Sequence, residues 1–422
     1  MRYIEKLLAI SLGCYAISLL LSIALMEIFS SLIALLVIGL VIKERQWQLF
    51  KFRWHIEGAL FGLLGVVILG AIVNNTESPP LKIIGGARWT LLFILVCAAL
   101  RAVPVERWEK FAPLLLGVIG VISIYAIFQH FTGVDLFRPG RTAQLYGYNE
   151  MGKPFYRTGG PYGTPMTYGN TIGIVFFFCL AQLFAPRSRT KKYLVLAALL
   201  CLTVLASLVL TFTRGVWVGL TAGLIAFFLM FGIKKFAKFA LIICAAFAVI
   251  FKLLPSVLAR VQTIFDPTYG SNVERWEIWK SHLAMFQEHP WLGVGYRESG
   301  HAIGDFLKSI GRPEVFAGHA HNNVLEVLGG TGVLGFCFWS VFILSLFVIS
   351  WKLFQNQERP FFRILALAGI AGHMFMQASG LTETTFFDAE TNHTFLFLMA
   401  CMLVSYERSS ERSDGAARNQ RL

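Results

Sequence analysis

The sequence predicts an all-α polytopic membrane protein that forms a single integral domain over residues 1–422. Of its 422 residues, 56% are hydrophobic and only 14% are charged, and the mean hydropathy is +0.63. A soluble domain would carry about twice that charged fraction. Apolar runs recur along the chain, and each has about the 17–25 residues that cross a hydrocarbon layer of about 30 Å. We therefore expect about twelve transmembrane helices.

The apolar segments can be assigned in order along the chain. The first two fill Leu7–Ile42, with a turn near Met26–Ser31. We interpret the first run as an uncleaved helix, because it is too long for the apolar core of a signal peptide and leads directly into further spans. The other ten segments are Gly58–Val73, Trp89–Leu100, Pro113–Phe131, Tyr168–Ala185, Tyr193–Phe212, Val216–Phe231, Phe239–Leu254, Gly330–Ser350, Ile364–Gln377 and Thr391–Tyr406.

The formal net charge of +13 is spread over short loops that alternate with less basic ones. The basic segments are Lys43–Arg53, Arg101–Lys110, Arg187–Lys192, Lys234–Lys238, Lys352–Arg363 and Arg408–Arg421. The positive-inside rule places these segments, and with them both termini, in the cytoplasm. Such dispersed charge suits the anionic headgroups of membrane lipids, and it argues against a nucleic-acid partner. The regions expected on the outer face are Asn74–Arg88, Thr132–Pro165, Pro255–Asn323 and Gly380–Glu390.

The longest outer loop, residues 255–323, should carry short helices of its own. Within it, Glu274–Gln287 has apolar residues at helical spacing, and Pro290 follows where this helix should end. The second outer loop, residues 132–165, interleaves arginines, tyrosines and glycines. Both loops are polar in a chain that is otherwise almost all apolar, so they are the expected place for a binding or catalytic site.

Three arginines on the outer side are candidates for binding an anion. Arg214 lies between two apolar runs, where a cation is costly without an anionic partner. Arg275 begins the predicted loop helix, where a cation opposes the helix dipole. Arg157 stands beside glycines that allow the backbone to approach a ligand. The alternatives are a helix-end anchor for Arg214, an ion pair with Glu274 or Glu277 for Arg275, and a solvated loop charge for Arg157.

Two histidines are candidates for proton transfer. His321 opens the segment that returns the long loop to the membrane, and a neutral imidazole is a natural general base near neutral pH. His319 lies two residues earlier, so either histidine could serve as the base, and the alternative is a merely polar or capping role. A His-x-His pair could also contribute to a metal site, but no third ligand stands at a recognisable spacing. We therefore expect neither a metal nor a cofactor.

Together these motifs resemble the O-antigen ligase and polymerase superfamily of bacterial envelope glycosyltransferases. The matching stretches are Arg214-Gly215, the Arg-Trp-x-x-Trp stretch at Arg275, His-Pro-x-x-Gly-x-Gly from His289, His-Asn-x-x-Leu from His321 with Gly-x-x-Gly ending at Gly332, and the Arg-x-Gly at Arg157 with Asn170 beyond it. Their order and placement carry the resemblance, which covers about Arg157 to Gly335.

The resemblance implies a GT-C-like fold in the bacterial inner membrane with a periplasmic active site. It also implies transfer of a glycan from undecaprenyl pyrophosphate to a sugar hydroxyl of lipid A-core, without a metal and with inversion. Arg214, Arg275 and, by a weaker match, Arg157 would hold the pyrophosphate, and His321 would act on the acceptor hydroxyl. A polymerase or a protein O-oligosaccharyltransferase of the same superfamily remains an alternative. Outside this class, a transporter of lipid-linked glycans could also use outer-face arginines.

Overall fold

The computed structural model describes residues 2–74, 76–149, 151–184, 190–309, 311, 318–355 and 359–419. Its first half contains α1 (Arg2–Ser18), α2 (Ile23–Glu44), η1 (Trp47–Leu49), η2 (Trp54–Gly58), α3 (Ala59–Val73), α4 (Pro80–Gly86), α5 (Trp89–Ala102), α6 (Val105–Thr132), β1 (Leu145–Tyr148), β2 (Pro154–Tyr156), α7 (Pro165–Phe184) and α8 (Lys191–Val209). Its second half contains α9 (Arg214–Leu229), α10 (Ile233–Leu253), α11 (Pro255–Gln262), α12 (Gly270–Glu288), α13 (Ser299–Ser309), α14 (Asn323–Gln355), α15 (Pro360–Ser379) and α16 (Ala389–Asn419). The expected all-α polytopic architecture is confirmed.

Eight helical segments of the described residues are long and apolar enough to cross a membrane. They are Ile23–Glu44, Trp54–Val73, Pro80–Ala102, Val105–Thr132, Pro165–Phe184, Lys191–Val209, Asn323–Gln355 and Pro360–Ser379. The sequence predicted about twelve spans, and each of the twelve segments does contain a helix. The turn predicted near Met26–Ser31 is wrong, because these residues lie inside α2 and the chain turns between Ser18 and Ile23 instead. The count by length and composition is lower partly because α1 has 17 residues and α9 has 16, so each is short for a full crossing.

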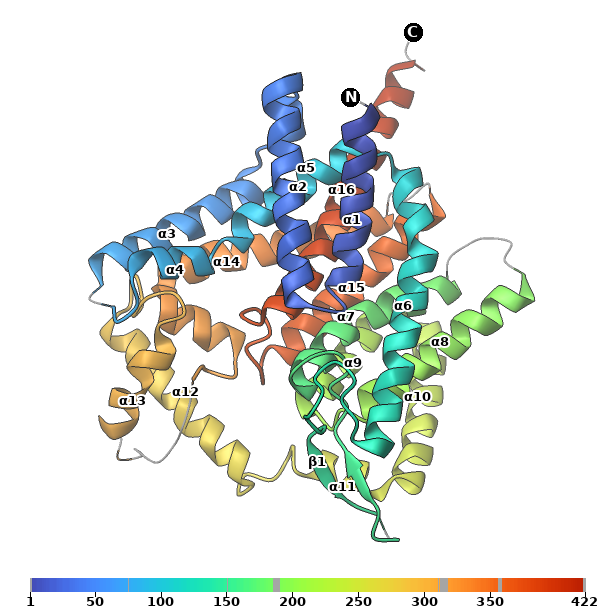
Figure 1. Cartoon of the computed structure of the whole chain (residues 1–422), viewed down its shortest axis with the longest axis vertical. Coiled ribbons are helices and arrows are strands. Elements are labelled where there is room, and N and C mark those ends of the chain that lie inside the picture. The colour runs from blue at the N-terminus through green and yellow to red at the C-terminus, as the bar shows by residue number, and fades with distance from the viewer. Residues whose placement is uncertain are drawn as a thin grey trace.

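The two ends of the molecule differ in what they carry (Figure 1). Both termini lie at one end, together with the last turns of α2. The β1–β2 hairpin and α11 lie at the opposite end, and α12 and α13 are on that side as well. The long loop predicted over residues 255–323 therefore does contain helices, and these lie away from the termini.

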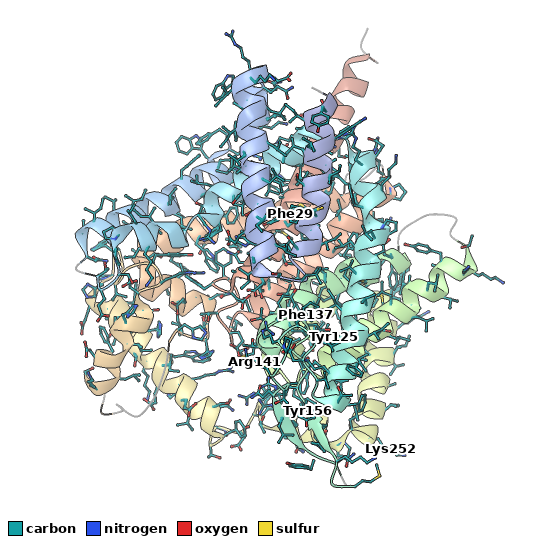
Figure 2. All side chains as sticks on the ribbon, viewed as in Figure 1. Phe29, Tyr125, Phe137, Arg141, Tyr156 and Lys252 are labelled. Carbon is teal, nitrogen blue, oxygen red and sulfur yellow. The ribbon has the colours of Figure 1, made fainter. Side chains whose placement is uncertain are left out.

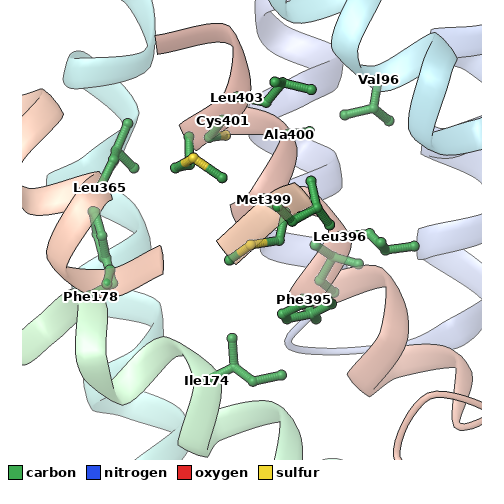
Figure 3. Close-up of a cluster of buried hydrophobic side chains, with 14 of the residues drawn as sticks. Val96, Ile174, Phe178, Leu365, Phe395, Leu396, Met399, Ala400, Cys401 and Leu403 are labelled. Carbon is green, nitrogen blue, oxygen red and sulfur yellow. The ribbon is translucent and has the colours of Figure 1, made fainter. Parts of the chain in front are cut away.

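Helices α7 and α15 form the buried centre of the bundle, and each has 78% of its apolar window inside the protein. Glycines on α9 allow that helix to lie against α15. A Cβ atom added at Gly219 or Gly223 would stand 2.9 Å from the backbone oxygen of Phe375 or Ala371, respectively. Small residues at helix interfaces permit this close approach in membranes. Figure 3 shows part of the apolar core, including Phe395, Met399 and Leu403 of α16.

Helix α14 is interrupted at Gly332, whose φ of 63° and ψ of −168° are not helical. The segment after α12 packs into this interruption. Val294 N–H donates to the carbonyl of Gly329 at 2.9 Å, and Val333 N–H donates to that of Pro290 at 2.8 Å. A Cβ atom at Gly332 would stand 2.3 Å from the Trp291 backbone. The glycine motif that follows His289 and the glycine motif that ends at Gly332 thus contact each other through their backbones, and this contact holds the long loop against α14.

The second loop, residues 132–165, contains the antiparallel hairpin β1–β2, which the sequence did not predict. Figure 2 shows Tyr125 and Phe137 close together beside α6, and Tyr156 on the hairpin. Tyr125 packs against the Phe137 ring at 5.4 Å, and its hydroxyl accepts a hydrogen bond from Leu136 N at 2.9 Å. These contacts hold the loop against α6 and position Arg157, which follows β2.

Candidate active site

Arg214 is the first residue of α9, directly after the turn that ends α8. Its guanidinium donates to the carbonyl of Thr263 at 2.8 Å and to the hydroxyl of Ser271 at 2.7 Å. It also lies 5.1 Å from the centre of the Tyr269 ring. Arg214 is buried, and no carboxylate of the described residues forms an ion pair with it. Its direct partners are thus a carbonyl, a hydroxyl and an aromatic ring.

Two further arginines converge on the turn before Arg214. Arg157 donates to the Thr211 carbonyl at 2.8 Å and to the Thr213 hydroxyl at 3.0 Å. Arg260 of α11 donates to the Phe212 carbonyl at 3.3 Å. Burial, assisted by the charge of Arg260, lowers the pKa of Arg157 to about 10. Arg157 is thus half-buried and hydrogen-bonded to the turn before Arg214, close to the charge of Arg260.

Arg275 lies in the second turn of α12, which begins four residues before the predicted helix start. Its Nη2 atom lies 2.6 Å from Oε1 of Glu383, in the loop between α15 and α16. The sequence had suggested Glu274 or Glu277 as the ion-pair partner. Arg275 instead joins α12 to a loop 108 residues away along the chain, because α12 packs across the end of the bundle.

His321 shares Glu383 with Arg275. Its Nδ1 atom is 3.0 Å from Oε2 of that carboxylate. Since an ionised carboxylate only accepts hydrogen bonds, Nδ1 must carry the proton, and Nε2 of the neutral ring then carries a free lone pair. Burial alone would raise the pKa of Glu383, but the hydrogen bond from His321 and the charge of Arg275 hold it below its usual range. The pair has the geometry of a histidine base oriented by a carboxylate.

Backbone geometry holds His321 in an unusual position. Its φ of 49° lies in the left-handed region, which costs free energy for a residue other than glycine. The neighbouring asparagines fasten this turn to the loop that carries Glu383. Asn322 Nδ2 donates to the Leu381 carbonyl at 3.1 Å, and Asn323 Oδ1 accepts from Phe386 N at 3.0 Å. The separation of His321 and Glu383 is thus fixed from both sides.

Glu326 holds the turn that contains His321 through a second set of contacts. Its carboxylate accepts hydrogen bonds from the backbone N–H of Ala320 at 2.7 Å and from the hydroxyl of Ser299 at 2.5 Å. It also lies 3.5 Å from Nε2 of the fully buried His282. Glu326 therefore joins α12, α13 and the histidine turn at a single buried point.

His319 is close to His321 but differs from it. The two rings are 4.2 Å apart. Burial, followed by the charge of His321, lowers the pKa of His319, and its Nδ1 atom has no hydrogen-bond partner among the described residues. Within the same described part of the chain, no three His, Cys, Asp or Glu residues are placed to hold a metal ion. The structure thus gives an orienting carboxylate to His321 rather than to His319.

A cavity of about 580 Å³ lies next to two of the arginines. Arg214 and Arg275 line it from α9 and α12, and Thr382 lines it from the loop of Glu383. Trp276 and Trp279 add an aromatic wall. Gly215 allows the Thr382 loop to approach, because a Cβ atom there would stand 2.4 Å from the Thr382 hydroxyl. The Arg-Gly motif thus brings a buried cation and the Glu383 loop to one cavity.

Sequence reasoning missed Glu383 and Arg260. Both lie in regions expected on the outer face, where the positive-inside rule disfavours a cation, so Arg260 could have been noted from the sequence on that ground. Glu383 follows an apolar span, and only the tertiary fold, in which α12 packs against α13 and α14, brings its two partners to it. Asn170, noted as a motif residue, accepts a hydrogen bond from Ser379 and joins α7 to the end of α15.

Taken together, the fold and the site define a polytopic α-helical membrane protein with an arginine cluster, a cavity lined by Arg214 and Arg275, and a histidine whose orienting carboxylate also pairs with Arg275. Comparison with known proteins agrees with this class. The O-antigen ligase family model matches residues 196–340, which include Arg214, Arg260, Arg275, His319 and His321. An O-antigen ligase of Pseudomonas aeruginosa is 26% identical over 319 residues, which cover 74% of this chain and 68% of that protein. The resemblance to the O-antigen ligase family is thereby confirmed.

Proposed function

We propose that this protein is an O-antigen ligase that transfers a glycan from undecaprenyl pyrophosphate to a sugar hydroxyl of lipid A-core. The observation that carries the proposal is the juxtaposition, through Glu383, of a histidine base and one of the cavity's arginines. One carboxylate therefore couples the group that would activate the acceptor to a group that would hold the donor. The donor and acceptor proposed for this arrangement are those of the O-antigen ligase family, whose resemblance to this chain both comparisons support.

The arginines account for the donor. As the anomeric C–O bond breaks, negative charge grows on the departing lipid pyrophosphate. Arg214 and Arg275 line the cavity, and a guanidinium can make forked contacts with phosphate oxygens. Arg157 and Arg260 surround the turn before Arg214 and add positive potential. Such preorganised charge is most effective where water is excluded. On this account the reaction proceeds without a metal.

The histidine accounts for the acceptor. The hydroxyl of the acceptor sugar would donate its proton to Nε2 of His321 while its oxygen forms the new glycosidic bond. Attack opposite the pyrophosphate would invert the anomeric centre. Glu383 stabilises the imidazolium that forms, and a positioned base of this kind contributes on the order of 10²–10⁴ in rate. Among the described residues no carboxylate pairs with His319 in this way, and His319 would have a smaller role.

We place the cavity at the periplasmic face of the bacterial inner membrane, with both termini in the cytoplasm. The basic Lys43–Arg53 segment follows α2, whose last turns lie at the same end as both termini, whereas the hairpin and α11 lie at the other end. Single cysteines tested in a cysteine-free variant would decide the orientation. Thr268→Cys should react with an impermeant maleimide added outside the inner membrane, and Gln48→Cys should react only after lysis. Labelling in the reverse pattern would reject this placement.

The activity itself is tested by reconstitution. The purified protein is supplied with an undecaprenyl-pyrophosphate glycan and either lipid A-core or a second molecule of the donor as acceptor. A ligase should join the glycan to lipid A-core. Extension of the second donor would instead identify a polymerase, and movement of the lipid across the bilayer without transfer would identify a transporter.

A further inference from the structure

A second cavity lies far from the arginine cluster, inside the bundle between α1, α6, α7, α15 and α16. Its volume is about 110 Å³, and its wall is almost entirely apolar. Phe178, Leu365 and Cys401, all labelled in Figure 3, form part of this wall. One water molecule needs about 10–15 Å³ of such space, but an apolar cavity stays dry and accepts apolar molecules. The space therefore suits hydrocarbon rather than water.

The cavity has the shape and position of a site for a lipid chain. Along α1 its wall runs from Ala9 to Ile17, a distance of about 12 Å at the helical rise per residue, and Leu19 and Leu20 of the following turn extend it. Where α1 meets α6, the lining residues Ile17 and Leu115 are only half-buried, so this seam lies at the perimeter of the bundle. A lipid chain could enter there from the bilayer.

Polar groups without partners gather at one end of the cavity. Arg107 and Trp108, in the first turn of α6, both line it. Nη1 of Arg107 and Nε1 of Trp108 are buried and have no hydrogen-bond partner among the described residues. Arg408 lies 4.8 Å from the Trp108 ring and hydrogen-bonds the carbonyl of Val103, so it holds the indole in place. Buried donors without an acceptor are costly, and a guanidinium most favours an anionic oxygen.

We propose that this cavity binds one anionic phospholipid of the leaflet that faces the chain termini. One acyl chain lies between α1 and α6, and the phosphodiester accepts hydrogen bonds from Arg107 and Trp108. The first turn of α6 would also present the positive end of the helix dipole to the phosphate. The headgroup end of this site is at the α5–α6 turn, away from Arg214 and His321. The site is therefore distinct from the proposed glycan-transfer site and does not depend on it.

The test is photolabelling of the full-length protein in nanodiscs. The probe is phosphatidylglycerol with a diazirine in its acyl chain, compared with a phosphatidylcholine probe of the same chains. Peptides that contain Ala9–Leu20 or Arg107–Leu115 should be labelled by the first probe, and unlabelled phosphatidylglycerol should compete better than phosphatidylcholine. Equal labelling by the two probes, or labelling confined to other helices, would overturn the proposal.

Variants sharpen the same experiment. Arg107→Gln should reduce labelling by about tenfold, because it removes a charged donor, and Arg107→Lys should restore part of it. Lys110→Gln removes the same charge from an exposed position three residues along α6 and should leave labelling unchanged. Ala112→Phe should reduce labelling by filling the cavity. Because Ala112→Phe could also disturb packing, Arg107→Gln decides: parental labelling of that variant would reject the site.

Discussion

Replacing Glu383 with glutamine should slow glycan transfer severely while leaving the protein folded. Glutamine has nearly the same shape, and it keeps an oxygen that can accept from Arg275. It removes the negative charge that lies 3.0 Å from His321 Nδ1. At that distance two unit charges attract by about 5 kcal/mol at an effective dielectric constant of about 20. This charge would stabilise the imidazolium formed in the transition state.

Solvent screening reduces that figure. The His321 side chain is 26% exposed, although the Glu383 side chain is only 8% exposed. We therefore expect a loss of about 3–4 kcal/mol, which corresponds to about 10²–10³-fold in turnover. Glu383→Asp should recover part of the rate, because it keeps the negative charge but places it farther from His321.

The assay is single-turnover transfer by protein in nanodiscs, with donor affinity measured separately. Thr384→Val provides a matched control, because Thr384 is the adjacent buried residue of the same loop and carries no charge. Glu383→Gln should lower the transfer rate far more than it weakens donor binding. If the variant turns over at the parental rate while remaining folded, Glu383 does not orient or stabilise the base, and the reasoning is refuted.

Four further predictions follow from the same geometry. Arg214→Ala and Arg275→Ala should each weaken donor binding and slow transfer by about 10²–10³-fold, with poor rescue by lysine, which cannot make the forked contact; unchanged donor affinity would exclude them from the pyrophosphate site. His321→Ala should reduce turnover by about 10²–10⁴-fold with donor binding nearly intact, whereas His319→Ala should be milder; the opposite ranking would transfer the role of base to His319. Transfer should survive EDTA, and a loss that added Mg²⁺ or Mn²⁺ restores would establish a metal requirement. Burial lowers the pKa of His319 in the folded protein below the value of 6.5 expected in the unfolded chain. As the pH falls below that value, the unfolded chain takes up a proton at this residue before the folded protein does, so the stability present at higher pH is lost. The fall in melting temperature between about pH 7 and pH 5 should thus be smaller in His319→Gln, and an equal fall would contradict the assigned shift.

Local sequence rules predicted the helices well because apolar runs of sufficient length have few alternatives to a helix in a bilayer. The spacing of apolar residues predicted α12, but it did not show which face of this helix packs against the rest of the protein. Ile278 and Met285 are buried against α13, whereas Trp276 is 57% exposed and lines the cavity. Both faces of this helix carry apolar residues, so periodicity could not separate them.

The sequence predicted which charged residues belong to the site, but it did not predict the tertiary contacts between them. Arg214 was identified because a cation between apolar runs is costly, and His321 because it returns a polar loop to the membrane. The link between Arg275 and His321 through Glu383 joins three segments far apart in the chain, and it depends on the tertiary packing of α12 against α13 and α14. The hairpin of residues 145–156 was also missed, because its strands have only four and three residues.

The most direct test of the central claim is transfer by the purified protein and its Glu383→Gln and His321→Ala variants, with lipid A-core and an undecaprenyl-pyrophosphate glycan as substrates. The account predicts glycan-bearing lipid A-core with the parent, and donor binding with transfer slowed by about 10²-fold or more with both variants. Transfer by the variants at the parental rate, or a parent that binds the donor and never transfers its glycan, would contradict it.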